Sequence, residues 1–289
     1  MKPVFEPTGT TVQETLPEGI VAIGDRSEGS VYVYDDQIVL AVNVALVTQR
    51  PLLVAGPPGS GKSSLALNIA RVLGWRYEEE VLTPRTEARD LLWRFDAVRR
   101  LRDAQIGKLE GDEAYIDKGA LWRAFESGDG QGRCVVLLDE IDKADPDVPN
   151  SLLEALGALR FTVAETGDPV TVDKASAPFI VLTTNEEREL SRPFLRRCVV
   201  LRIRRPDAER LHEIAVAHGF DGDDDLTKQA IERLDVLALE ADAAGQPAPS
   251  AAELIDVLRA ARELEIDTND SSWNAMLEVA MVKPPDGSP

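Results

Sequence analysis

The chain has 289 residues, of which 44% are hydrophobic, and its 51 Asp and Glu residues outnumber 32 Lys and Arg residues to give a formal net charge of −19. This length exceeds that of an ordinary single domain, so we expect one large domain and a smaller one. The composition is typical of a globular protein with an aliphatic interior and excludes a wholly disordered or fibrous chain. The negative charge disfavours non-specific binding to nucleic acid.

Cysteine use and hydropathy narrow the class of protein further. Cys134 and Cys198 each open an apolar run, where cysteine acts as a small hydrophobe, so we expect no metal site built on them. The N-terminal segment is acidic and has no apolar core, and no run of eighteen apolar residues occurs. We therefore predict a cytoplasmic protein without a membrane partner.

The first third of the chain begins with an irregular arm and then alternates helices with strands. An N-terminal arm rich in Pro, Gly, Thr and Glu is expected over residues 1–30, followed by a mostly buried helix over 36–48. PLLVAG is an expected buried strand, and the helix after the next glycine-rich loop should end at Gly74. YEEEVLT is a weaker strand. An amphipathic helix over 90–105 is predicted to turn four apolar residues inward, namely Leu91, Phe95, Val98 and Leu101.

Three more strands are expected at CVVLLDEID, FIVLTTN and CVVLRI, and FTVAETGDPVTV is predicted to form a hairpin. Strands separated by helical segments indicate an α/β fold with a largely parallel sheet, whose ligands bind at the carboxyl ends of the strands. We assign an αβα domain to residues 31–205 on this basis.

The pattern changes near residue 206, because three helical stretches and no convincing strand follow. One of these helices begins with a capping box formed by Ser250 and Glu253. We therefore predict a small all-helical domain over 206–282 and a disordered tail over 283–289.

A nucleotide-binding loop is predicted by Gly56-Pro57-Pro58-Gly59-Ser60-Gly61-Lys62-Ser63, which matches the P-loop pattern G-x-x-x-x-G-K-[ST] between an expected strand and an expected helix. The glycines let backbone N–H groups curl around a β-phosphate, and the helix N-terminus adds positive potential. Lys62 would neutralise the β- and γ-phosphates, and Ser63 would supply a hydroxyl ligand to Mg²⁺. Ser64 is grouped with these nucleotide-binding residues.

Polar residues end two of the buried strands. Asp139 would hold Mg²⁺ through its water shell, and Glu140 would polarise the attacking water as general base. Asn185, at the end of the next strand, is positioned to hydrogen-bond the water or the γ-phosphate. Arg196 and Arg197 close a short predicted helical turn, and a guanidinium suits the charge of a phosphoryl-transfer transition state.

GPPGSGKS, VVLLDEID, LTTN and FLRRC, in this order and spacing, resemble the motifs of AAA+ ATPases. KGALWRAFESG, NSLLEALGALRFTV and APFIVLTTN narrow the resemblance to the MoxR-like branch. The resemblance covers roughly residues 30–265.

The resemblance implies a P-loop NTPase of αβα type with a helical lid domain, which binds ATP with Mg²⁺ at subunit interfaces of a ring, commonly a hexamer. Arg196, Arg197 or both would be the arginine finger that reaches the neighbour's site, and Asn185 would be the sensor-one residue. Tyr34 and Asp35 would border the adenine. The branch also implies a remodelled client protein and a partner with a von Willebrand factor A domain.

One departure concerns the lid, because the family's Ser-Pro-Arg-Ala sequence is replaced here by Pro249-Ser250-Ala251-Ala252-Glu253. Arg259, two turns further along, is a candidate replacement for the missing arginine. Three alternatives to a client-remodelling ATPase stay open at this point. They are a nucleic-acid-associated NTPase motor, a small-molecule phosphotransferase, and a regulatory switch that holds ATP with little turnover.

Overall fold

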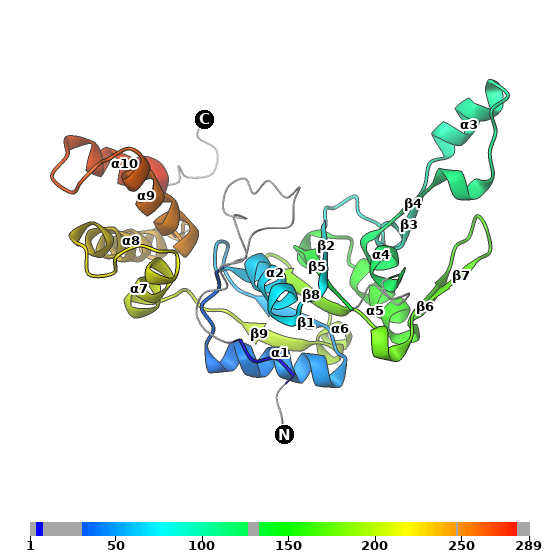
Figure 1. The fold of residues 1–289 in the computed structure, drawn as a ribbon, viewed down its shortest axis with the longest axis horizontal. Coiled ribbons are helices and arrows are strands. Elements are labelled where there is room, and N and C mark those ends of the chain that lie inside the picture. The colour runs from blue at the N-terminus through cyan, green and yellow to red at the C-terminus, as the bar shows by residue number, and fades with distance from the viewer. Residues whose placement is uncertain (1–3, 8–30, 127–132, 247, 282–289) are drawn as a thin grey trace. The chain divides into compact units, whose positions relative to one another are not determined.

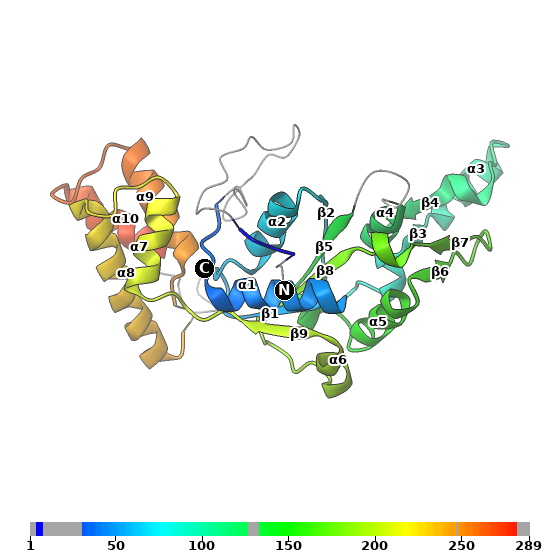
Figure 2. The same ribbon diagram turned by 60° about the horizontal axis from the view of Figure 1, so that its bottom comes forward.

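The computed structural model describes residues 4–7, 31–126, 133–246 and 248–281 (Figures 1 and 2). These residues divide into two compact units. Of these residues, the first unit contains 4–6, 36–55 and those between 69 and 201, and the second contains 7, 31–35, 56–68 and those from 202 onward. None of the helices in the described ranges is long and apolar enough to cross a membrane. The predicted arm over 1–30 and the tail over 283–289 lie almost entirely outside the described residues.

A five-stranded sheet organises the first unit, with the order β2-β5-β8-β1-β9. The paired strands β2 with β5, β5 with β8, and β8 with β1 are all parallel. This confirms the predicted α/β fold. The strands are β1 (Leu52–Ala55), β2 (Arg76–Val81), β5 (Cys134–Asp139), β8 (Phe179–Thr184) and β9 (Val199–Arg202).

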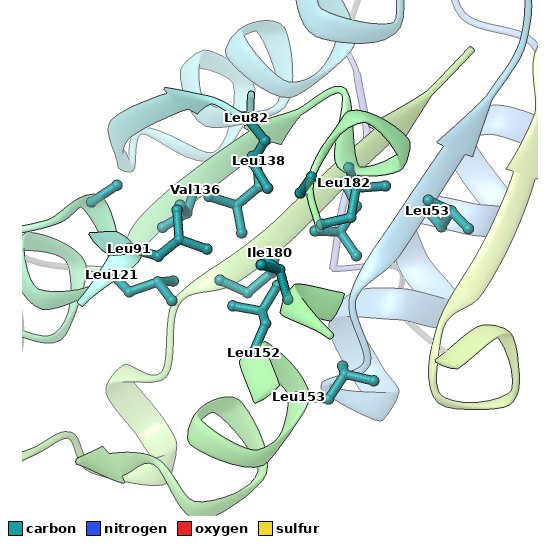
Figure 3. Packing of buried hydrophobic residues seen from close by; sticks show 14 of the residues in the cluster. Leu53, Leu82, Leu91, Leu121, Val136, Leu138, Leu152, Leu153, Ile180 and Leu182 are labelled. Atoms are coloured by element: carbon teal, nitrogen blue, oxygen red, sulfur yellow. The ribbon is translucent and has the colours of Figure 1, made fainter. Parts of the chain in front are cut away.

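The three central strands are buried at every position, which explains why they read as continuous apolar runs rather than as alternating ones. Side chains at alternate positions of these strands, such as Leu53, Leu138 and Leu182, form one hydrophobic cluster with residues of the covering helices (Figure 3). The helices of this unit are α1 (Asp36–Thr48), the C-terminal part of α2 (Lys62–Leu73), α3 (Ala97–Gln105), α4 (Ala120–Glu126), α5 (Val148–Ala158) and α6 (Arg192–Arg197).

The prediction of one helix over 90–105 with an inward apolar face is wrong, both in the secondary structure and in the burial of its residues. The chain forms a 3₁₀ turn, η2 (Ala88–Leu91), then strand β3 (Trp93–Phe95) and only then α3, and it returns through η3 (Asp112–Tyr115) to strand β4 (Ile116–Lys118). We call Trp93–Lys118 the insertion. Leu91 is buried as predicted, but Val98 is 80% exposed and Leu101 is 61% exposed. The antiparallel pairing of β3 with β4 carries α3 away from the core, so none of the residues of α3 is buried.

The predicted hairpin is confirmed as β6 (Arg160–Thr162) paired with β7 (Pro169–Thr171), and Gly167 adopts a positive φ in the turn. Phe161 of β6 lies in an aromatic cluster in which Trp93 stacks on it at a centroid distance of 5.7 Å, and Trp122 meets it edge-on at 5.5 Å. The Trp93 indole also donates a hydrogen bond of 2.6 Å to Glu165 in the turn. The hairpin and the insertion therefore extend together from the sheet (Figures 1 and 2).

Helix α1 has the predicted bounds but is only partly buried. Leu40 is 64% exposed and Val44 is 39% exposed, so the outward face of α1 is apolar. On its other side Asn43 accepts hydrogen bonds from the backbone of Val4 and Phe5 and donates one to the Phe5 carbonyl. Phe5 is completely buried, so this short segment of the predicted arm packs against the first unit.

The C-terminal part of the second unit has four helices in its described residues, rather than the three predicted stretches. They are α7 (Ala208–Ala217), α8 (Asp225–Ala244), α9 (Ala251–Glu263) and α10 (Ser271–Met281). Their inward faces share a hydrophobic cluster that includes Leu211, Leu234, Leu258 and Trp273. The predicted capping box is confirmed, because the Glu253 carboxylate accepts a 2.9 Å hydrogen bond from the Ser250 N–H.

Candidate functional site

The glycine-rich loop joins the carboxyl end of β1 to the first turn of α2, as the pattern predicts. Gly59 and Gly61 have φ of 68° and 83°, a region that side chains with a Cβ rarely adopt. The Lys62 side chain is only 7% exposed, and its ammonium donates hydrogen bonds of 3.0 Å and 2.8 Å to the carbonyls of Gly56 and Pro57. The lysine therefore lies within the curve of the loop.

Two close approaches within the second unit leave no room for a side chain on Gly56 or Gly59. A Cβ on Gly56 would lie 2.5 Å from the Ile203 carbonyl oxygen, and one on Gly59 would lie 2.0 Å from the Ser250 hydroxyl. The start of α9 thus abuts the loop at the position where the family's lid arginine would stand. Arg259 lies further along α9 and is half-buried.

The loop has a polar group suited to an anion. The Ser60 hydroxyl is buried and has no hydrogen-bond partner among the described residues. A buried polar group without a partner is costly, and a phosphate oxygen would satisfy it. The exposed Pro57 and Pro58 and the half-buried Ser63 and Ser64 complete the loop and the helix start.

The segment before α1 also contacts this loop within the second unit. A Cβ on Gly61 would lie 3.3 Å from the Tyr32 ring, and the Tyr34 hydroxyl donates a 2.5 Å hydrogen bond to Asn68 of α2. Burial raises the pKa of Tyr34, so its phenol stays protonated. The Arg210 guanidinium of α7 donates to the carbonyls of Val33 and Tyr34 and fixes the segment.

The acidic residues lie at the carboxyl end of β5, in the first unit. Asp139 is 7% exposed, and its carboxylate accepts a hydrogen bond from the Thr183 hydroxyl of β8. The same hydroxyl accepts a 2.9 Å hydrogen bond from the Glu140 N–H. Thr183 was not predicted as a site residue, although a Thr pair in an otherwise apolar strand is a signal. It fixes both acids with one hydroxyl.

Glu140 has an unusual backbone, with φ of 60° and ψ of 50°. This left-handed conformation costs a residue with a Cβ about 1–3 kcal/mol, and such residues are common at functional sites. The Glu140 carboxylate accepts a 2.9 Å hydrogen bond from the Lys143 ammonium and lies 3.5 Å from the Asn185 amide nitrogen. The hydrogen bond to Glu140 raises the pKa of Lys143. The structure thus brings Asp139, Glu140 and Asn185 together.

The paired arginines end α6, whose first turn contains Pro193 as predicted. Arg196 and Arg197 are both exposed, and no hydrogen bond or ion pair involves their side chains within residues 4–7, 31–126, 133–246 and 248–281. Their carbonyls, in contrast, accept hydrogen bonds from Arg50. Within the described part of the chain, the side chains of these arginines are therefore not bonded to the acidic residues.

The donor set suits magnesium rather than a metal held by protein ligands alone. The described residues contain no group of three His, Cys, Asp or Glu side chains that could hold a metal. Mg²⁺ prefers oxygen ligands and is usually bound through one or two carboxylates together with substrate phosphates and waters. The Ser63 hydroxyl and the Asp139 carboxylate are ligands of this kind.

Comparison with known proteins finds matches over the region that contains the glycine-rich loop and the acidic strand. A model of the AAA domain, dynein-related subfamily, matches residues 51–198, which is just over half of the chain. The chaperone ClpB from Agrobacterium fabrum is 34% identical over 139 residues, which cover 47% of this chain and 14% of ClpB. A ClpA homologue from Fuscovulum blasticum is 33% identical over 113 residues, covering 38% of this chain and 12% of that protein. The chain thus spans only about a seventh of the curated relatives it matches.

Solved structures align with most of the chain at low sequence identity. A RuvB variant from Thermotoga maritima aligns with 84% of this chain and 66% of its own, at a TM-score of 0.44 and 18% identity. A putative ATPase from Cytophaga hutchinsonii aligns with 84% of this chain and 78% of its own, at a TM-score of 0.44 and 17% identity. From the family match over the loop, the sheet and α6, the chain belongs to the AAA domain family, in its dynein-related subfamily.

Proposed function

We propose that this chain binds ATP with Mg²⁺ and hydrolyses it. The observation that carries the proposal is the P-loop between β1 and α2, with Gly59 and Gly61 at positive φ and Lys62 buried in the curve of the loop. Backbone N–H groups in such a loop bind phosphate, and the helix N-terminus favours negative charge. Lys62 moves from the carbonyls of Gly56 and Pro57 to the phosphates when nucleotide binds.

In this proposal, the acids at the end of β5 take part in hydrolysing the bound ATP. The Ser63 hydroxyl and Asp139 would hold Mg²⁺, the latter through water, and the ion would neutralise phosphate charge. Glu140 accepts a proton from the attacking water as the water oxygen bonds to the γ-phosphorus and the bond to the β-phosphate oxygen breaks. Asn185 orients that water. Lys143 supports the proposal because it fixes the Glu140 carboxylate beside Asn185.

We infer that hydrolysis is completed between copies of the chain in a ring, commonly a hexamer. The exposed Arg196 and Arg197 carry this inference, since neither bonds to the acids of its own chain within the described residues. Residues 31–205 would form the nucleotide-binding domain and residues 206–282 the lid. Tyr34 and Asp35 would border the adenine.

We place the chain in the MoxR-like branch and assign it a chaperone-like role, the remodelling of a client protein beside a partner with a von Willebrand factor A domain. The predicted hairpin, confirmed as β6–β7, supports this branch. The similarity to ClpB, which is named a chaperone, supports remodelling of protein rather than of nucleic acid. The net charge of −19 agrees with that choice.

The test is Lys62→Ala, with Lys108→Ala in the exposed part of the insertion as the matched control. Calorimetry should show loss of tight ATP binding in the first variant only, because it removes the cation at the phosphates. Undiminished affinity would contradict the P-loop assignment. In the unmodified protein, ATP binding without turnover would favour the regulatory switch, and submicromolar, salt-sensitive binding to duplex DNA would favour the nucleic-acid motor.

A further inference from the structure

The backbone that carries the exposed arginines is held by another arginine. Arg50 lies between α1 and β1, and its Nη2 atom donates hydrogen bonds of 2.6 Å to the carbonyls of Arg196 and Cys198. Its Nε atom donates a 3.3 Å hydrogen bond to the Arg197 carbonyl. One guanidinium thus binds three consecutive carbonyls at the end of α6, 146 to 148 positions away in the sequence.

Backbone hydrogen bonds also hold residues 50 and 51 in place. The Arg50 N–H donates a 3.2 Å hydrogen bond to the Ala45 carbonyl, and the Val199 N–H donates a 2.8 Å hydrogen bond to the Pro51 carbonyl. The junction of α6 and β9 is therefore tied to residues 50 and 51 through both the Arg50 side chain and the main chain. Strand β1 begins directly after these residues and leads to the P-loop.

The chemistry of the contact explains why an arginine is needed. The last carbonyls of a helix lack intrahelical donors. Because α6 has only six residues, these carbonyls make up a large part of the helix. A planar guanidinium presents several donors in a fixed fork, whereas a lysine ammonium is a compact point charge. A positive charge at a helix C-terminus is also favourable. The same charge repels the guanidinium groups of Arg196 and Arg197, which favours their outward orientation.

We propose that Arg50 is a positioning residue for Arg196 and Arg197, fixing the end of α6 so that the two guanidinium groups reach a neighbouring copy's nucleotide in one geometry. This inference rests on the proposed action of these arginines in trans. Arg50 touches neither nucleotide nor reacting atoms in this scheme. It acts through the α6 carbonyls alone.

The consequence for kinetics is specific. A displacement of about 1 Å in a catalytic group can cost roughly 10²-fold in rate. Arg50→Gln should therefore lower kcat by about 10²-fold and leave the KM and the Kd for ATP unchanged. Arg50→Lys keeps the positive charge but loses the planar, forked arrangement of donors. Its kcat should lie between those of Arg50→Gln and the unmodified protein.

The matched control is Arg133→Gln. Arg133 is also half-buried and donates two hydrogen bonds to a backbone carbonyl, that of Ala177, at 3.3 Å and 3.2 Å. It makes no hydrogen bond to α6. Its loss should lower stability without lowering kcat, so a fall in kcat with Arg50→Gln alone would not be a general effect of removing a structural arginine.

Mixing experiments separate positioning from a role in the variant's own site. Lys62→Ala cannot bind ATP but donates intact arginines, so it should restore hydrolysis to Arg50→Gln. The double variant Arg196→Ala/Arg197→Ala binds ATP but lacks the arginines, so it should not restore hydrolysis. Equal rescue by both partners, or a normal kcat in Arg50→Gln, would overturn the inference.

The proposed function and this inference fail differently. If Arg196→Ala/Arg197→Ala hydrolyses ATP at the full rate, the proposed action in trans is wrong, and so is the role proposed for Arg50. If the double variant is inactive while Arg50→Gln and Arg50→Lys both have normal kcat, only the role of Arg50 is wrong. Should Arg50→Gln fail to fold, Arg50→Lys gives the same comparison with a smaller change.

Discussion

The carboxyl ends of β5 and β8 and the carboxyl end of α6 carry charged side chains of opposite sign, and they differ in whether those side chains have partners. Asp139 is buried against Thr183, and Glu140 is bound by Lys143. Arg196 and Arg197 are exposed, although Arg50 binds their backbone carbonyls. On the proposed function, the chain completes one part of the site by itself and presents the other part to a different molecule.

The largest effect is expected where the side chains have no partner of their own. Arginine fingers contribute roughly 10³–10⁵ in rate, so Arg196→Ala/Arg197→Ala should bind ATP normally and hydrolyse it slower by about that factor. Steady-state turnover measured over a range of protein concentrations tests this, and turnover per subunit of the unmodified protein should rise with concentration. Arg192→Ala, on the first turn of α6, is the control. Full activity of the dilute monomer would contradict the comparison.

Among the partnered residues, Glu140 should show the next largest effect. Glu140→Gln preserves size but cannot accept the proton from water, so hydrolysis should fall by roughly 10²–10⁴-fold while ATP binding persists. Single-turnover assays and calorimetry measure the two quantities separately. The exposed Glu189→Gln serves as a control. Normal turnover in Glu140→Gln would mean that another group activates the water.

Thr183→Val should lower stability, because hydrogen bonds of the Thr183 hydroxyl join the carboxyl ends of β5 and β8. The substitution keeps the shape but removes the hydroxyl that donates to Asp139 and accepts from the Glu140 N–H. Removing a hydrogen-bond partner from buried polar groups costs about 1–3 kcal/mol, which should appear as a lower midpoint in urea unfolding. Thr162→Val, exposed on β6, should stay within about 0.5 kcal/mol. An unchanged midpoint for Thr183→Val would mean that water replaces the hydroxyl.

The smallest effect is expected in the rates at which two buried thiols react. Comparing these rates tests whether the backbone at the end of α6 opens as rarely as that of β5. Cys134 begins β5 and Cys198 follows α6, and burial raises the pKa of both thiols from 9.0 to about 12. The raised pKa contributes stability that is fully present below pH 9 and is lost as the pH rises toward 12. At pH 8 both thiols should therefore react slowly with iodoacetamide.

Mass spectrometry of each cysteine peptide over time would measure the two rates. Rapid labelling of Cys198 beside a protected Cys134 would show that the α6 end opens locally, against the comparison drawn above. Arg50→Gln should accelerate labelling of Cys198 only, since Arg50 binds the Cys198 carbonyl and does not contact β5 through any hydrogen bond within the described part of the chain.

The sequence predicts those features whose cause is local. Unbroken apolar runs identify β5 and β8, and the spacing of glycines and Lys62 identifies the loop, because each depends on neighbouring residues. Arg50 could not be predicted, since its partners lie about 147 positions away. Thr183 and Lys143 act through pairings that a pattern does not show. The helix over 90–105 was misjudged because apolar periodicity indicates an amphipathic helix but does not say whether a core lies beside it.

The aromatic cluster around Phe161 makes the β6–β7 hairpin visible to spectroscopy. Two of the four tryptophans, Trp93 and Trp122, lie against Phe161, whereas Trp75 is covered by Arg133 and Trp273 lies in the core of the second unit. A protein carrying Trp75→Phe and Trp273→Phe would emit only from beside the hairpin. Its intrinsic fluorescence would then report in real time whether nucleotide turnover moves this part of the molecule.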